Sequence, residues 1–156
     1  MDYRTVAAAQ PYRGIRNNNP GNLQPPPGLT NWQGAVGADG PFVIFADTTW
    51  GLRAMAVDLT SKINNDGLTT ITAIITVYAP PPENDTASYI SAVASDTGFG
   101  ADDVLAADSG TLALLIRAIV NHEEGDGPSQ QFVSDADIAT GISMAGSPTT
   151  VFPQQP

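Results

Sequence analysis

From residue 52 onward, apolar residues recur at the spacing of an α-helix, and this pattern is the strongest constraint on the fold. Apolar side chains at positions 52, 55, 56, 59 and 63 lie on one helix face. The same period predicts further helices over 70–78, from 85 or 86 to 98, over 109–123, and from 134 onward. Capping residues, glycines and a triple proline bound these segments. We therefore expect a mainly α (α+β) fold in a small helical domain.

The N-terminal third has a different composition. Residues 13–41 hold few apolar side chains and many turn formers, which predicts ordered loop or short strand at best, and residues 42–45 form a short strand-like run. A length of 156 residues suits one domain with one core. We expect an N-terminal arm over 1–12, a domain over 13–146 and a Pro/Gln-rich tail over 147–156.

The charge excludes two classes of partner. Six basic residues face sixteen acidic ones, the net charge is −10, and the basic residues form no run. A nucleic-acid groove needs clustered Lys or Arg, and an anionic membrane would repel this chain. No apolar run approaches membrane-spanning length, so membrane insertion is not expected. The chain has no cysteine and one histidine, so we expect no disulfide, no metal and no cofactor.

Three consecutive asparagines, Asn17, Asn18 and Asn19, precede Pro-Gly and then Asn22. We call residues 13–23 the asparagine block. Asparagine amides both donate and accept hydrogen bonds, so they can bind sugar hydroxyls and N-acetyl groups. The alternative is a turn in which the asparagines bond their own backbone.

A proline stretch at 80–82 is followed by Glu83, Asn84, Asp85 and Thr86 at the start of a predicted helix. Glu83 or Asp85 could be a catalytic carboxylate. The alternative is that Asp85 caps the helix and Glu83 favours its positive end. That end would stabilise an ionised Glu83, which suits an electrostatic stabiliser or base better than an acid.

The helix over 109–123 ends at the sequence Asn-His-Glu-Glu-Gly, which includes His122, Glu123 and Glu124. The negative end of the helix dipole disfavours an ionised glutamate, so the pKa of a shielded glutamate there rises, as a general acid requires. The alternative is a pair of solvated glutamates at a frayed end. We interpret His122 as a packing or hydrogen-bonding residue.

Aromatic residues form the fourth notable group. Trp32 and Tyr78, with Phe42, Phe45 and Trp50, could line a sugar groove by stacking. The alternative is that they belong to the core.

Together these segments resemble a known family. The order of the asparagine block, Trp-Gln-Gly at 32–34, Gly-Leu-Arg-Ala at 51–54, Ala-Pro-Pro with Glu-Asn-Asp-Thr at 79–86, and His-Glu-x-Gly at 122–125 is similar to a family of tailed-phage and prophage virion proteins. These proteins are usually described as structural, and they resemble lysozyme-like or glucosaminidase-like wall hydrolases. The resemblance covers about residues 13–144.

The resemblance implies a lysozyme-like helical domain in the virion, in the tail or tail tip, that opens host peptidoglycan locally during genome delivery. Glycosidic cleavage needs a protonated carboxyl and a group that stabilises positive charge on the sugar. Glu123 as the acid and Glu83 as the stabiliser would serve. The candidate substrate-binding residues are Asn17, Asn18, Asn19, Asn22, Trp32, Asn84, Asp85 and Thr86. The expected partners are peptidoglycan and other virion proteins.

A second hypothesis is a non-catalytic virion component with the same fold. Lysozyme-like enzymes have a glutamate at the end of an early helix, but here no acid except Asp2 precedes Asp39 and no early helix is evident. Where the family often has His-Glu-Asn-Gly, this chain has Glu at position 124. These departures favour the second hypothesis.

Overall fold

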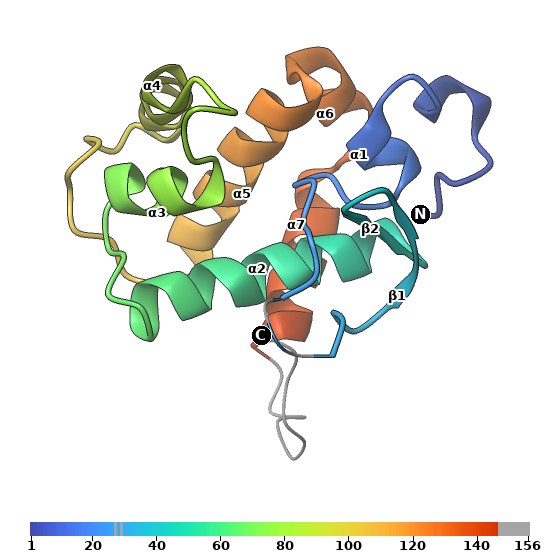
Figure 1. Cartoon of the computed structure of the whole chain (residues 1–156), viewed down its shortest axis with the longest axis horizontal. Coiled ribbons are helices and arrows are strands. Elements are labelled where there is room, and N and C mark those ends of the chain that lie inside the picture. Colours follow the sequence, from blue (N-terminus) through green and yellow to red (C-terminus); the bar gives the residue numbers. More distant parts are fainter. Residues whose placement is uncertain (27, 29, 147–156) are drawn as a thin grey trace.

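The computed structural model describes residues 1–26, 28 and 30–146, and it confirms the expected fold class. Helices dominate, and a two-stranded antiparallel hairpin lies near the N-terminus (Figure 1). The predicted tail over 147–156 lies outside the described residues. No helix in the described part of the chain is long and apolar enough to cross a membrane.

The elements follow one another along the described chain in the order seen in Figure 1. A 3-10 turn η1 and a one-turn helix α1 come first, then the hairpin, and then six helices. Their bounds are η1 Ala7–Ala9, α1 Arg13–Arg16, β1 Ala35–Asp39, β2 Phe42–Phe45, α2 Thr48–Asn64, α3 Ile71–Tyr78, α4 Thr86–Thr97, α5 Ser109–Glu124, α6 Asp126–Phe132 and α7 Asp135–Ala145.

The core lies around α2 and α5, the two longest helices. Leu52, Leu59, Leu115 and Ile119 are fully buried on their facing sides. α7 packs closely along α2, because Gly141 has no side chain: a Cβ there would lie 2.6 Å from the Cβ of Leu52. Burial of this apolar surface is the main force that holds the helices together.

The helix starts agree with the sequence. Asp47, Thr70, Asp85 and Ser134 each accept a hydrogen bond from a backbone N–H in the first turn of α2, α3, α4 and α7. Asp108 caps α5 in the same way. Gly98 ends α4 in the left-handed conformation that glycine adopts without strain.

Two helices were not predicted. α1 is a single turn within the segment expected to be loop. α6 contains Gly127 and Pro128, which are poor helix formers, but its proline lies in the first turn, where the missing N–H has no helical partner to lose. The N-terminal residues cover α6, with the ring of Tyr3 packed edge-on against Phe132 at 5.2 Å between centroids.

The hairpin positions the asparagine block. β1 and β2 pair with each other, and β2 also donates two backbone hydrogen bonds to the asparagine block. The N–H of Val43 donates to the carbonyl of Leu23, and the N–H of Phe45 donates to the carbonyl of Asn17. The block therefore lies beside the hairpin and over the start of α2.

Candidate functional site

The side-chain amides of Asn18 and Asn19 form hydrogen bonds inside the fold. Both residues have 0% exposure. Asn19 donates to the carbonyls of Leu23 and Val43, and accepts from the N–H of Leu23, each at 2.9 Å. Asn18 donates to the carbonyl of Phe45 and to Asp2, and accepts from the N–H of Tyr3. These two side chains connect the block to the hairpin and to the N-terminal segment by hydrogen bonds.

Asn17 is also turned inward. It is 4% exposed, and its amide donates to Asp39 at 3.1 Å, as does Arg16. Both bonds lower the pKa of the Asp39 carboxyl. The three consecutive asparagines of the block thus all have their amides bonded within the fold.

Asn22 is placed differently. It is partly exposed and adopts the left-handed conformation with φ 51°, which asparagine tolerates better than most residues. Its amide nitrogen donates to Glu123 at 2.8 Å and to Glu124 at 3.0 Å, and its oxygen accepts from Arg13 at 3.3 Å. One side chain therefore joins two carboxyl groups from the end of α5.

Glu124 lies in a space that a glycine leaves open. Its Oε1 accepts from the N–H of Gly14 at 3.0 Å, and a Cβ on Gly14 would lie 2.2 Å from Oε2. Burial and the charge of Glu123 raise the pKa of the Glu124 carboxyl to about 7. Donation from the backbone of α1 and the nearby Arg13 oppose this rise in part.

Glu123 contacts a tyrosine on the neighbouring helix α4. The hydroxyl of Tyr89 donates to its Oε2 at 2.8 Å. The ring of Tyr89 is buried and stacks on His122 at 3.8 Å, so His122 packs as expected. Burial raises the pKa of the Tyr89 hydroxyl well above its usual value, so this hydroxyl keeps its proton and remains a donor.

A groove of about 550 Å³ leads away from Asn22. Trp32 and Tyr78, two of the aromatic residues expected to line a sugar groove, are both in its wall. Trp32 is only 5% exposed and donates to the carbonyl of Gln24, so it presents little open ring surface. The remaining lining residues are Leu23, Gln24, Pro25, Pro26, Asp58, Ser61, Lys62, Asp66, Val77 and Pro80.

The other end of the Tyr78 ring is fixed to the asparagine block. Its hydroxyl donates to the carbonyl of Gly21, which is possible because Gly21 has no side chain in the way. Along the groove, Lys62 and Asp58 form an ion pair at 2.7 Å. With Asp66 the groove therefore carries one net negative charge from its side chains.

The residues at 84–86 before and at the start of α4 form their hydrogen bonds locally. Asp85 caps α4 through the N–H of Ser88, Thr86 donates to the carbonyl of Ala79, and Asn84 donates to that of Pro80. Glu83 is exposed and makes no hydrogen bond or ion pair with any residue that the structure describes. Within the described residues, no hydrogen bond joins Glu83 to Glu123.

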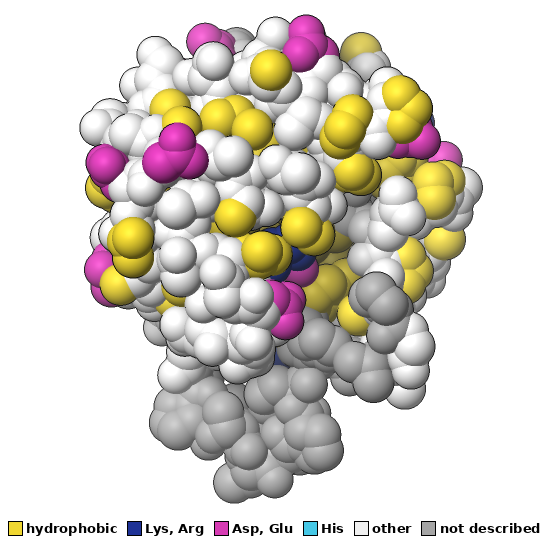
Figure 2. All heavy atoms as spheres, turned by 60° about the vertical axis from the view of Figure 1, so that its left-hand side comes forward, with side chains coloured by type: hydrophobic (Ala, Val, Ile, Leu, Met, Phe, Trp, Pro, Cys, Tyr) yellow, Lys and Arg dark blue, Asp and Glu magenta, His cyan; other side chains and the backbone are white. Residues whose placement is uncertain are grey.

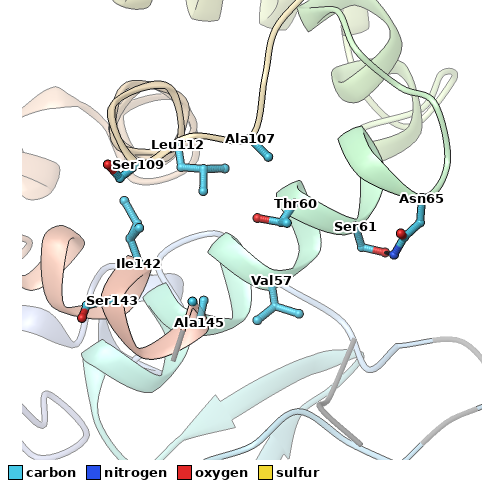
Figure 3. Close-up of a pocket in the computed structure, with 11 residues that line it drawn as sticks. Val57, Thr60, Ser61, Asn65, Ala107, Ser109, Leu112, Ile142, Ser143 and Ala145 are labelled. Atoms are coloured by element: carbon cyan, nitrogen blue, oxygen red, sulfur yellow. Dashed lines mark hydrogen bonds between the residues drawn. The ribbon is translucent and has the colours of Figure 1, made fainter. Parts of the chain in front are cut away.

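A second hollow, of about 680 Å³, is lined by residues of α2, α5 and α7 (Figure 3). Val57, Leu112 and Ile142 point into it from α2, α5 and α7, and the hydroxyls of Thr60, Ser109 and Ser143 lie around it. It has no charged lining residue and no predicted site residue. Ser61 lines both hollows.

The face of the molecule shown in Figure 2 carries no cluster of basic side chains. On the face shown in Figure 2, acidic side chains are scattered and very few basic atoms are visible. Among residues 1–26, 28 and 30–146, no group of three His, Cys, Asp or Glu side chains is placed to hold a metal ion.

Comparison with known proteins gives the family. No protein-family model matches the chain. It is 36% identical over 119 residues to Protein P5 of Pseudoalteromonas phage PM2, and the match covers 74% of this chain and 73% of P5. The chain belongs to the family of this P5. The expected origin in a phage is thereby confirmed, whereas the name P5 states no activity, so the likeness to lysozyme stays a prediction.

The main residues that sequence reasoning did not single out are Glu124, Gly14 and Tyr89. Glu124 stood in the predicted segment, but Glu123 was chosen as the acid. The helix period carries no signal for burial of Glu124, because the face of Leu115, Ile116 and Ile119 continues toward position 123. The side chain of Glu124 is enclosed instead by α1, where it fills the space beside Gly14.

Proposed function

We propose that this protein is a virion component that cleaves the glycan strands of host peptidoglycan during genome delivery. Glycan would lie in the groove beside Asn22, Trp32 and Tyr78, and the acids at the end of α5 would cleave it. The observation that carries the proposal is that one groove residue, Asn22, is bonded to both carboxyl groups at the end of α5.

The chemistry of these groups fits glycoside cleavage. The reaction needs a carboxyl that still holds its proton near neutral pH and a second carboxyl that stabilises the developing charge. A Glu124 pKa of about 7 meets the first need. Sugars present apolar faces and hydroxyls, which suit the aromatic and polar groups that line this groove.

A virion location would also resolve a conflict of charge. Peptidoglycan is anionic overall, and a free protein with net charge −10 would be repelled from it. A protein fixed among other virion proteins is delivered to the wall by the particle. We therefore propose other virion proteins and peptidoglycan as partners, and neither nucleic acid nor membrane insertion. Kinship with P5 of a phage supports this setting.

The test is a turbidity and muropeptide assay on permeabilised cell walls. Wild type is compared with Glu83→Gln, Glu123→Gln and Glu124→Gln, and Asp102→Asn serves as a control because Asp102 is an exposed acid distant in sequence from these groups. We expect new muropeptides from wild type and from the control, and their loss on substitution of a catalytic acid. Folded wild type that releases no muropeptide would refute cleavage.

A non-catalytic virion component is the second candidate, and one observation favours it. Asn17, Asn18, Asn19, Asn84, Asp85 and Thr86 all have their polar groups bonded within the fold. Most of the predicted glycan-binding groups are thus already occupied. The absence of new muropeptides would favour this candidate, whether or not the protein binds glycan.

A further inference from the structure

We infer that Glu123 and Glu124 work as one proton-sharing pair, in which Glu124 is the acid and Glu123 is its charged partner. This inference rests on the proposed function and changes its residues, because the sequence assigned these roles to Glu123 and Glu83. We call the two side chains the carboxyl pair.

A shared donor holds the carboxyl pair together. Asn22 Nδ2 lies 2.8 Å from Glu123 Oε1 and 3.0 Å from Glu124 Oε2, so the two carboxyl oxygens lie within two hydrogen-bond lengths of each other. Two negative charges at that separation repel strongly when they are partly removed from water. The pair therefore favours the state with one proton.

The surroundings decide which glutamate keeps the proton. Glu123 accepts a hydrogen bond from the hydroxyl of Tyr89. This hydrogen bond is stronger when the carboxyl of Glu123 is ionised. Glu124 fills the space beside Gly14, and the effect of its burial outweighs the opposing effect of the N–H groups of Gly14 and Ile15. Desolvation disfavours charge there, so the proton belongs on Glu124.

The other charged and titratable groups around the pair act in known directions. Arg13 of α1 favours the ionised form of Glu124 but does not outweigh burial and Glu123. Tyr78 of α3 and Tyr89 of α4 are neutral, since burial raises the pKa of both hydroxyls. His122 of α5 stacks on Tyr89. Hydrogen bonds from Ser88 are the main cause of the lowered pKa of the Asp85 carboxyl, and His122 adds a smaller effect.

The resulting step balances with water as the second reactant. Glu124 gives its proton to the glycosidic oxygen, and the carbon–oxygen bond breaks with its electron pair on that oxygen. Glu123 stabilises the positive charge that develops on the sugar carbon. The oxygen of a water molecule then bonds to this carbon, and a proton of that water restores Glu124.

The first test needs no substrate. The chain has three glutamates, Glu83, Glu123 and Glu124, so glutamate labelled with ¹³C at Cδ gives one carboxyl resonance for each. We expect the Glu124 resonance to titrate near pH 7, as the raised pKa predicts, and to titrate at lower pH in Glu123→Gln, which removes the neighbouring charge. Glu83→Gln assigns the third resonance and should leave Glu124 unchanged.

Two results of the titration would overturn the pair. One is that both glutamates titrate independently in the usual range of a free glutamate. The other is that Glu123→Gln does not move the Glu124 titration although the variant is folded. A circular dichroism spectrum and a cooperative melt of each variant establish that it is folded.

The second test separates the pair from the proposed function. If wild type cleaves glycan, we expect Glu124→Gln to lower the rate by about 100-fold or more, the usual loss for a general acid. Cleavage that survives Glu124→Gln but is lost in Glu83→Gln would overturn the inference and leave the proposed function standing. If wild type does not cleave, the proposed function fails, and the titration alone decides whether the pair exists.

Discussion

Asn19 and Asn22 stand three positions apart in one loop, and they do different work. The amide of Asn19 is fully buried and bonds three backbone groups, two of them within the loop and one in the hairpin. The amide of Asn22 is at the edge of a groove and bonds two carboxyl groups from α5. Asn19 fixes the loop against the hairpin, and Asn22 connects the loop to the acids of α5.

This difference shows what an asparagine-rich motif can mean. The same amide chemistry suits a sugar and a peptide backbone equally well. What separates the two asparagines is the burial of their partners: backbone carbonyls for Asn19, partly exposed carboxylates for Asn22. Substitution of Asn19 should therefore mainly lower the stability of the fold. Substitution of Asn22 should mainly change the titration of Glu124.

The largest effect on stability is expected from Asn19→Ala. It removes three hydrogen bonds and leaves the carbonyls of Leu23 and Val43 without this donor in a buried place. We expect a loss of about 3 kcal/mol in the free energy of unfolding, since unpaired buried groups cost their full desolvation. Urea unfolding measures it. A loss below about 1 kcal/mol would mean that the hydrogen bonds of Asn19 contribute little to the stability of the fold.

The next largest effect is a pH dependence that Glu124→Gln should abolish. The folded-state pKa of about 7 lies above the ordinary 4.5, so the folded protein binds more protons between these values. Stability therefore falls as pH rises from about 4.5 to about 7. We expect the variant to gain about 2 kcal/mol over wild type across this range, less than the full shift because the carboxyl is partly exposed.

Unfolding by urea at pH 4.5 and at pH 7.5 measures this gain. Glu83→Gln is the matched control, because it makes the same chemical change at an exposed carboxyl. A difference between Glu124→Gln and wild type that stays constant with pH would contradict the raised pKa.

A smaller effect is expected from Tyr89→Phe. The variant keeps the ring stack on His122 and removes only the hydroxyl that donates to Glu123. We expect a loss of about 1 kcal/mol in the free energy of unfolding at pH 8, the usual size for one hydrogen bond. Equal stability of the two proteins would indicate that water replaces the hydroxyl at no cost.

The smallest effect on stability is expected from Asn22→Gly. Glycine accepts the left-handed backbone of this position, so the variant removes the side chain without strain. We expect a loss below about 1 kcal/mol, because water can reach the freed carboxylates. The Glu124 carboxyl, deprived of a donor, should titrate at higher pH. A loss as large as that of Asn19→Ala would erase the contrast between the two asparagines.

The helical part of the fold could be predicted because its signals are local. The apolar period, the caps at Asp47 and Asp85, and the glycine at 98 each act within a few residues. α1 was not predicted because a single helical turn is too short to show an apolar period, and because turn-forming asparagines follow it. α6 escaped because Gly127 and Pro128 argue against a helix whose first turn tolerates them.

The site could be predicted only in outline. The sequence brought forward the loop and the end of α5 that meet at Asn22, and the aromatics Trp32 and Tyr78 that line the groove. It did not distinguish Asn22 from Asn18 and Asn19, because that distinction depends on which face the hairpin covers. Nor did it select Glu124, because the groups that enclose it come from Gly14, at the opposite end of the chain.

The bond between Gly14 and Glu124 spans 110 positions. A nascent chain that leaves the ribosome N-terminus first can fold the asparagine block as soon as the hairpin has emerged, but it cannot assemble the carboxyl pair until α5 is also free. If the pair cleaves glycan as proposed, a truncated product that ends before α5 lacks both acids. Synthesis itself would then delay activity until residue 124 has been made.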